Sequence, residues 1–381
     1  MNHRNTFQFT LAVLLATSLA GADEPKPKPE DVKCSWSQCE VQLITDKGKI
    51  ELEKSEKKED LEIRFRSGTT NDQLKSVSKV PWATAVKISG KDVSDLTPIA
   101  GLKKLKKLDL YGLDKITTIA PLASSTELEE LSLYMTKVSD IAPVKNMKKL
   151  KVLDLYATKV TDLAPIKDLK ELTYLNLYML EPKDYSPIKG LTKLETIWVQ
   201  FSTLKDTSLF TAMTALKSFQ GSWSKELADI SGLKNATQLE SLELDDCPVT
   251  NLDAAAGMLK LERLRARSTE IKSIAPLAKI TTLRWVDIGK TKVSDLSPLA
   301  ASTNLDSLDL RETKVTTLAP LAKLANLDEV ILTGTAVKDL TPLLASAKAK
   351  KLRKLELSKG SPKSMWAALE KENPKLVVEL N

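Results

Sequence analysis

The sequence predicts an α/β solenoid: a curved stack of short repeats with a parallel sheet on its concave face, short 3₁₀ or turn segments on its convex face, and a cap at each end. The pattern LxxLxLxx-T-x-V-x-D-L-x-P-L returns about every 22 residues over two-thirds of the chain. Repeats of roughly 20 to 29 residues with this leucine spacing are leucine-rich repeats. The regular units open at Leu105, Leu128, Leu150, Leu172, Leu194, Leu216, Leu239, Leu261, Leu283, Leu305 and Leu327.

Each repeat divides into a strand and a return segment. In the unit that opens at Leu105, Leu108 and Leu110 also point inward and the residues between them point outward, because strand side chains alternate. The return carries a valine, a leucine and usually a proline, which suits a tight turn or one 3₁₀ segment. Because the return is short and strands stand about 4.8 Å apart, the sheet is expected on the inside of the curve.

The first 32 residues are expected to lie outside the solenoid. Residues 1–22 are predicted to be a signal peptide, with a positive charge at Arg4, an apolar run over 7–20 and a small-residue cleavage site ending at Ala22. The run is shorter than the roughly 20 residues that span a bilayer, so an exported protein, secreted or periplasmic, is favoured over an uncleaved membrane anchor. No stable membrane insertion is expected after cleavage. Residues 23–32 alternate proline and charge, which indicates an extended linker.

Residues 33–84 are predicted to form an N-terminal cap over the open end of the solenoid. Alternating apolar residues on either side of the turn at 46–48 indicate a hairpin. A further strand is expected over 61–65, and 71–80 suits a short helix. A degenerate first repeat that opens at Leu61 is the alternative for part of this segment.

The repeats themselves are assigned to residues 85–357, which is about 12 units. Residues 358–381 are predicted to form a C-terminal cap, with a helix that places Trp366 and Leu369 on one face and then a last strand over 376–378. Such caps are needed because the final repeat would otherwise expose its core.

Composition argues against several classes of function. The net charge of +7 is distributed among interspersed acidic and basic residues, so no nucleic acid is expected as a partner. The one histidine is His3, inside the predicted signal peptide, which removes histidine-dependent catalysis and most zinc or iron sites. Asp287 and Asp309 share a concave row, but an open face shelters a carboxylate pair poorly. We therefore predict no enzyme activity, no cofactor and no metal.

The three cysteines fit an exported protein. Cys34 and Cys39 lie close together after the linker, and in an oxidising compartment they are predicted to form a small-loop disulfide. Cys247 occupies the unit position that is threonine in most other repeats, so a buried and unreactive thiol is expected there.

The units LKVLDLYATKVTDLAPIKD and LDSLDLRETKVTTLAPLAK resemble the repeats of internalin-type bacterial leucine-rich-repeat proteins, over roughly residues 85–357. The resemblance implies export and a concave face that binds host or surface proteins. No obvious immunoglobulin-like domain follows the repeats and no LPxTG sorting motif is present, so cell-wall anchoring is not expected.

Aromatic residues gather at predicted concave positions. Tyr111, Tyr134, Tyr156 and Tyr178 hold the same position in four consecutive units, and Tyr174 lies on the strand that leads to Tyr178. Tyrosine combines a rigid apolar face with a polar tip, which suits the recognition of proteins or sugars. The alternative is a self-stacked ladder that only stabilises the sheet.

Two further sets of side chains extend this candidate site. The irregular units over 194–260 add Trp198, Phe201 and Trp223 at or beside outward positions; alternatively, these rings turn inward and fill a distorted core. Farther on, one strand directs Arg263, Arg265 and Arg267 outward, with Arg265 and Arg267 taken as partner-binding residues. Ion pairing with flanking carboxylates is the competing explanation of the arginines; those carboxylates are Glu243, Asp245 and Asp287.

Together these features predict an exported, non-enzymatic scaffold whose concave, tyrosine-rich face binds a protein partner. The alternative is a carbohydrate-binding module that uses the same aromatic ladder as a stacking platform for a glycan.

Overall fold

The computed structural model describes residues 32–35, 38–42, 61–65 and 67–381. The predicted signal peptide, all but the last residue of the predicted linker, and the predicted hairpin turn at 46–48 lie outside the described residues. In the described part of the chain, no helix has the length and apolar character needed to cross a membrane.

The described residues form a single 17-stranded sheet. The first two strands pair in antiparallel fashion, and from β2 onward every strand pairs in parallel with the next one in sequence. The strands are β1 (Val32–Ser35), β2 (Gln38–Gln42), β3 (Leu61–Phe65), β4 (Ala85–Ile88), β5 (Lys107–Asp109), β6 (Glu130–Ser132), β7 (Val152–Asp154), β8 (Tyr174–Asn176), β9 (Thr196–Trp198), β10 (Ser218–Gln220), β11 (Ser241–Glu243), β12 (Arg263–Arg265), β13 (Trp285–Asp287), β14 (Ser307–Asp309), β15 (Glu329–Ile331), β16 (Lys354–Leu357) and β17 (Val377–Leu380).

Short helical segments form the return paths. In most units the return holds one 3₁₀ segment with proline in its first turn, where the missing N–H leaves no bond unmade. The 3₁₀ segments are Lys75–Lys79, Thr97–Gly101, Ala120–Ser124, Ala142–Asn146, Ala164–Ile166, Ser186–Gly190, Ser208–Phe210, Ser231–Asn235, Asp253–Gly257, Ala275–Leu277, Ser297–Leu299, Ala319–Leu321, Thr341–Leu343 and Lys363–Met365; the α-helices are α1 (Asn71–Leu74), α2 (Leu344–Lys348) and α3 (Ala367–Glu372).

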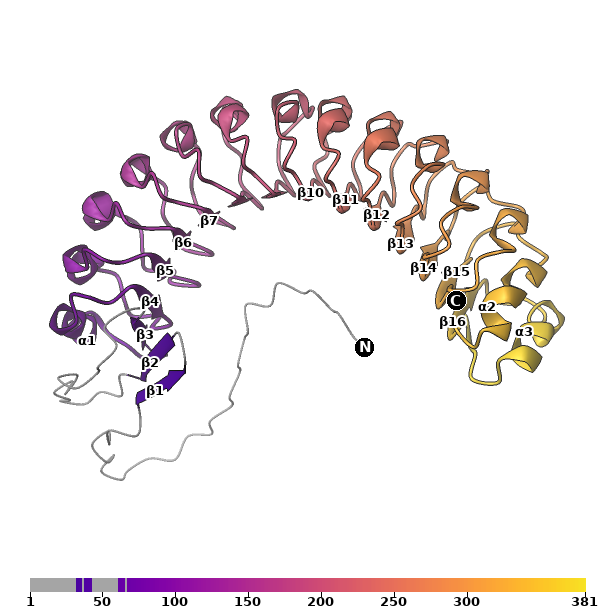
Figure 1. The fold of residues 1–381 in the computed structure, drawn as a ribbon, viewed down its shortest axis with the longest axis horizontal. Helices are drawn as coiled ribbons and strands as arrows, with labels where there is room; N and C mark the ends of the chain where they lie inside the picture. The colour runs from indigo at the N-terminus through magenta and orange to yellow at the C-terminus, as the bar shows by residue number, and fades with distance from the viewer. Residues whose placement is uncertain (1–31, 36–37, 43–60, 66) are drawn as a thin grey trace.

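The repeats curve into an arc, with the strands along its inner side and the 3₁₀ segments along its outer side (Figure 1). The predicted fold class, a curved leucine-rich-repeat solenoid, is confirmed. Inward leucines fill the space between the two sides: Leu105, Leu108 and Leu110 are at most 2% exposed, and one continuous apolar cluster extends from Ile63 to Leu376. Each unit is therefore stabilised by its two neighbours rather than by itself.

Shortly after most strands, a small polar side chain points into the interior, and these side chains form a row along the stack. The hydroxyl group of Thr136 donates a hydrogen bond to the carbonyl oxygen of Leu133 at 2.8 Å, and equivalent threonines repeat this bond along the stack. Cys247 takes the same position and is 1% exposed. Its thiol donates to the carbonyl oxygen of Gly221 at 3.2 Å, and burial raises its pKa to about 11. An inert thiol is expected from such a position.

The ends of the sheet carry the irregular segments. At the C-terminal end, Trp366, which directly precedes α3, and Leu369 within α3 are buried against the core, and β17 follows as the last strand. At the other end, β3 pairs in parallel with β4, so the repeat-like sheet already includes the strand at Leu61. The Cα atoms of Cys34 and Cys39 are direct partners across the β1–β2 pair, which places the two cysteines opposite each other.

Candidate functional site

The concave face presents three rows of outward side chains. In a three-residue strand, the first residue belongs to row 1 and the third to row 2, and the residue two positions after the strand belongs to row 3. In the unit of β12 these are Arg263, Arg265 and Arg267. Because every strand pairs in register with the next, each row runs along the whole arc.

Row 3 contains the four tyrosines that the sequence places in a ladder. The ring centroids of Tyr111 and Tyr134 lie 4.5 Å apart, those of Tyr134 and Tyr156 lie 4.0 Å apart, and those of Tyr156 and Tyr178 lie 4.6 Å apart. Interplanar angles of 19°, 6° and 21° mean that the rings stack face to face. The predicted ladder therefore exists and is self-stacked, and the ring faces between neighbours are covered by the next tyrosine.

Side chains of row 2 accept hydrogen bonds from the backbone N–H groups of the row 3 tyrosines. The carboxylate of Asp154 accepts a hydrogen bond from the backbone N–H of Tyr156 at 2.9 Å, and the side-chain oxygen of Asn176 does the same for Tyr178. Aspartate and asparagine favour such local bonds to the backbone two residues on. Asp154 is only 8% exposed, and this burial raises its pKa to about 6.

The residue after row 3 adopts a left-handed backbone conformation in unit after unit. Glycine fills this position at Gly112, but Phe201 and Trp223 occupy it with φ of 54° and 61°. Bulky side chains rarely adopt positive φ, and such strain persists only where the surroundings enforce it. The two rings stack on each other, with centroids 5.1 Å apart and planes 13° apart, and Phe201 lies 5.3 Å from Tyr178.

Six rings thus form one continuous surface along the strand exits, which we call the aromatic edge: Tyr111, Tyr134, Tyr156, Tyr178, Phe201 and Trp223. Sequence reasoning did not identify two methionines that widen it, Met135 and Met179, which are 49% and 54% exposed. Both sit at the left-handed position, and their spacing of 44 residues, two units, is the signal that could have revealed them.

Trp198 and Tyr174 form a separate aromatic pair in the middle of the concave face. Their ring centroids lie 5.6 Å apart in an edge-to-face arrangement, and both residues are half-buried. The indole N–H of Trp198 is buried and makes no hydrogen bond. The predicted inward alternative therefore applies to neither Phe201 nor Trp223, which lie on the aromatic edge, and only in part to Trp198.

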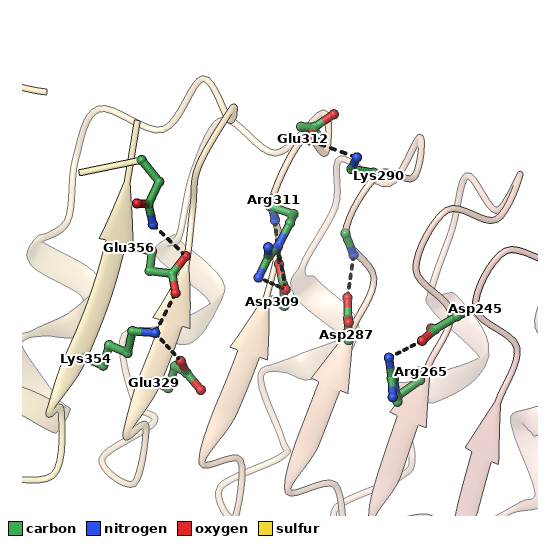
Figure 2. A network of polar contacts seen from close by, with 12 residues as sticks. Asp245, Arg265, Asp287, Lys290, Asp309, Arg311, Glu312, Glu329, Lys354 and Glu356 are labelled. Carbon is green, nitrogen blue, oxygen red and sulfur yellow. Dashed lines mark hydrogen bonds and ion pairs between the residues drawn. The ribbon is translucent and has the colours of Figure 1, made fainter. Parts of the chain in front are cut away.

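The arginines of β12 have three different environments. Arg265 makes an ion pair with Asp245, which lies two residues beyond the end of the neighbouring strand β11 (Figure 2). The guanidinium group of Arg263 lies 3.7 Å from the ring centroid of Trp285 instead. Arg267 donates its backbone N–H to Asp245, but its side chain makes no ion pair within the described part of the chain. Ion pairing thus explains only Arg265, and the role of Trp285 was not anticipated.

Beyond β12 the concave face is largely paired with itself. Arg311 folds back onto Asp309 at 2.7 Å, and Lys354 contacts Glu356 at 2.6 Å and Glu329 at 3.2 Å (Figure 2). Asp287 stands apart: it is 6% exposed, and burial together with the nearby Asp309 carboxylate raises its pKa to about 6. The molecule therefore has an aromatic half and a charged half, with β12 at the boundary.

Comparison with known proteins supports the assignment of the fold. The family described as the leucine-rich-repeat domain of the endo-beta-N-acetylglucosaminidase EndoS matches residues 68–179. A comparison with curated protein sequences gave no match. An internalin (InlF) of Listeria monocytogenes is similar in structure, with 26% identity, a TM-score of 0.70, and coverage of 77% of this chain and 84% of that one.

More distant solved structures share the solenoid alone. A leucine-rich-repeat protein of Leptospira interrogans is 17% identical, with a TM-score of 0.67 and coverage of 84% of this chain and 89% of that one. The ectodomain of the Arabidopsis thaliana receptor kinase GASSHO1/SCHENGEN3, in complex with CASPARIAN STRIP INTEGRITY FACTOR 2, is 14% identical, with a TM-score of 0.54 and coverage of 84% and 49%. The predicted resemblance to internalins is confirmed, and the chain is a leucine-rich-repeat solenoid.

Proposed function

We propose that this protein is an exported, non-enzymatic scaffold that binds a protein partner on its concave side, with the aromatic edge as the principal contact. The fold supports a protein-binding role, since the similar structures include an internalin and a receptor ectodomain solved with its bound factor. The aromatic edge is what narrows this role to one part of the surface.

One observation supports this placement most strongly. Phe201 and Trp223 occupy left-handed turns where glycine would relieve the strain, and their rings lie at the surface instead of in the core. Phe201 is 43% exposed. The same backbone position holds Gly112 and Lys290 in other units, so the turn itself does not require an aromatic residue. Exposed aromatic residues and methionines are also enriched in protein interfaces.

The stacking geometry favours a protein over a glycan. A sugar ring binds an aromatic platform through the ring face, but the inner faces of Tyr134 and Tyr156 cover each other at 4.0 Å. The tyrosines therefore present their edges, which suit the mixed apolar and polar side chains of a protein surface. A glycan would be left with the half-buried pair of Tyr174 and Trp198.

The proposal is tested by capturing partners from envelope and host-surface extracts with the mature protein and quantifying them by mass spectrometry. A variant that combines Tyr134→Ala, Tyr156→Ala and Tyr178→Ala should lose the captured protein, while Leu259→Ala, which removes an exposed apolar side chain away from the edge, should retain it. Retention by the triple variant with its circular dichroism spectrum unchanged contradicts the proposal. Selective binding to a glycan array, with no protein captured, favours the carbohydrate alternative.

A further inference from the structure

The direction of the first strand determines the side from which the preceding chain reaches the sheet. β1 runs antiparallel to β2, and its first residue, Val32, is the register partner of Val41 near the end of β2. β3, β4 and β5 run in the same direction as β2, so the chain before Val32 reaches β1 on the side where those strands end. The aromatic edge lies along the same strand ends and begins at Tyr111, just after β5.

The first ring of the tyrosine ladder has an open face on the side of β4. Tyr134 covers one face of Tyr111, with the ring centroids 4.5 Å apart. Because Lys87 and Asp109 are register partners, the row 3 position of the β4 unit belongs to Ser89, which is small and exposed. Among the residues that the structure describes, no second aromatic ring stacks on Tyr111, which is half exposed. This open face lies between β1 and the rest of the ladder.

The sequence just before β1 has a composition that suits an aromatic surface. Residues 24–29 read Glu-Pro-Lys-Pro-Lys-Pro, so each of them is a proline or precedes one. Proline fixes its own φ and biases the residue before it toward an extended backbone. Such a segment has little conformational freedom to lose when it docks. Proline-rich extended segments bind surfaces lined by aromatic side chains for this reason.

The length of this segment limits which side chains of the aromatic edge it can reach. Residues 23–31 span about 28 Å in a polyproline II conformation, at ~3.1 Å per residue. The units of β5 and β6 lie four and five strands from β1, which is roughly 19 and 24 Å at about 4.8 Å per strand. Tyr111, Tyr134 and Met135 belong to these units and are within reach. Met179 follows β8, seven strands from β1, and at roughly 34 Å it is beyond reach.

We propose that residues 23–31 dock on Tyr111 and Tyr134, with a proline against the open ring face of Tyr111, and compete there with the protein partner. The contact lies within one chain, and a short tether gives an effective concentration in the millimolar range. A contact too weak to hold a free peptide is then occupied for much of the time. The docking is independent of the proposed function, whereas the competition rests on it. Phe201 and Trp223 lie beyond the segment and stay open to the partner.

Methionine oxidation by hydrogen peroxide tests the docking. Met135 and Met179 hold the same left-handed position and are exposed to nearly the same extent, so the uncovered solenoid should oxidise both at similar rates. In the mature chain, which begins at Asp23, Met135 should be oxidised at least threefold more slowly than Met179, as measured by mass spectrometry of the sulfoxide-containing peptides. The matched comparison is a linker variant that carries Pro25→Gly, Pro27→Gly and Pro29→Gly.

The linker variant should oxidise the two methionines at similar rates, because its segment no longer docks. Tyr111→Ala should raise the oxidation rate of Met135 in the wild-type chain and have no effect on it in the linker variant. Tyr178→Ala, at the far end of the ladder, should leave Met135 protected. Equal rates for Met135 and Met179 in the wild-type mature chain, or protection that persists in the linker variant, would overturn the docking.

Affinity for the captured partner tests the competition. Threefold protection means that the segment covers the edge for about two-thirds of the time, so the linker variant should bind the partner about threefold more tightly in a calorimetric titration. Unchanged affinity, with Met135 still protected in the wild-type chain, would overturn the competition and leave the docking in place. Extracts that yield no protein partner would count against the proposed function, while the oxidation rates would still decide the docking.

Discussion

At the residue scale, a carboxylate on the concave face makes a local hydrogen bond to the backbone, but its burial disfavours its charged form. Asp154 fixes the turn of Tyr156 by accepting its backbone N–H, yet the carboxylate is 8% exposed. The neighbouring unit achieves the same bond with Asn176, which carries no charge. An aspartate and an asparagine therefore make the same hydrogen bond in neighbouring units. The effect of the buried charge on stability can be measured by exchanging one for the other.

Replacing Asp154 with Asn should stabilise the protein at neutral pH. The folded-state pKa of Asp154 is raised to about 6 from 3.8, so the folded protein keeps a proton that the unfolded chain has released between these values. Its contribution to stability is therefore complete below about pH 4 and is lost as the pH rises through 6. We expect the free energy of unfolding of Asp154→Asn to exceed that of wild type by on the order of 2 kcal/mol at pH 7.5.

Urea denaturation at several pH values measures this difference, which should vanish near pH 4. Asp295→Asn is the control, because that carboxylate is exposed and its pKa is lowered by hydrogen bonds from Ser297. An Asp154→Asn variant less stable than wild type at pH 7.5 would mean that the carboxylate is better solvated than its position indicates.

Cysteine reactivity tests the position of each thiol. Burial raises the pKa of Cys247 to about 11, so it should react with iodoacetamide only after denaturation. Cys34 and Cys39 should resist alkylation in exported protein until a reductant opens the predicted disulfide. Mass spectrometry of the labelled peptides gives the result. Ready labelling of Cys34 in folded, unreduced protein contradicts the disulfide.

At the element scale, the leucine core outweighs the ion pairs that join neighbouring units. Leu153 is fully buried on β7, whereas Lys149 and Glu127 pair at 2.6 Å but are 57% and 42% exposed. Exposed pairs contribute little because water and salt screen them. The alternating charges therefore serve solubility more than stability, and the inward leucines determine the stability of each repeat.

Leu153→Ala should lower the free energy of unfolding by about 2 to 5 kcal/mol, while Lys149→Ala, four residues earlier in the chain, should change it by less than about 1 kcal/mol. Thermal and urea unfolding provide both values. Neighbouring repeats should also lose cooperativity, because each depends on contacts across the unit boundary. Equal effects of the two substitutions would show that the Leu153 side chain does not point into the core.

At this scale, the sequence predicts which side chains of a strand point inward and which point outward. It does not predict the backbone conformation of the turns. The period of two residues along a strand is enough to predict that Tyr134 and Arg267 point outward. The left-handed turns at Phe201 and Trp223 carry no glycine that would signal them, so the sequence places these rings only at or beside outward positions. Arg263 and Trp285 stack across adjacent strands, and a 22-residue separation conceals that contact from local patterns.

At the scale of the whole molecule, one arc carries two kinds of surface. The aromatic edge extends from Tyr111 to Trp223, and the charged network occupies the units beyond β12. The repeat period is enough to predict the solenoid, because every unit repeats the same core. It cannot predict whether the tyrosines stack on one another, since ring orientation depends on the twist and curvature that all the units together create.

The central claim is that the aromatic edge binds the partner and is not needed for folding. Replacing Phe201 and Trp223 with glycine separates these roles, because glycine suits the left-handed turn as it already does at Gly112 and Gly334. Lys290→Gly makes the same backbone change away from the edge, at a residue that also has positive φ.

Calorimetric titration of the captured partner into these variants is the most direct measurement. The double glycine variant should keep or raise its Tm yet bind at least tenfold more weakly, which corresponds to about 1.4 kcal/mol, while Lys290→Gly should bind as wild type does. Unchanged affinity in a folded double glycine variant would contradict the claim and place the binding site elsewhere on the solenoid.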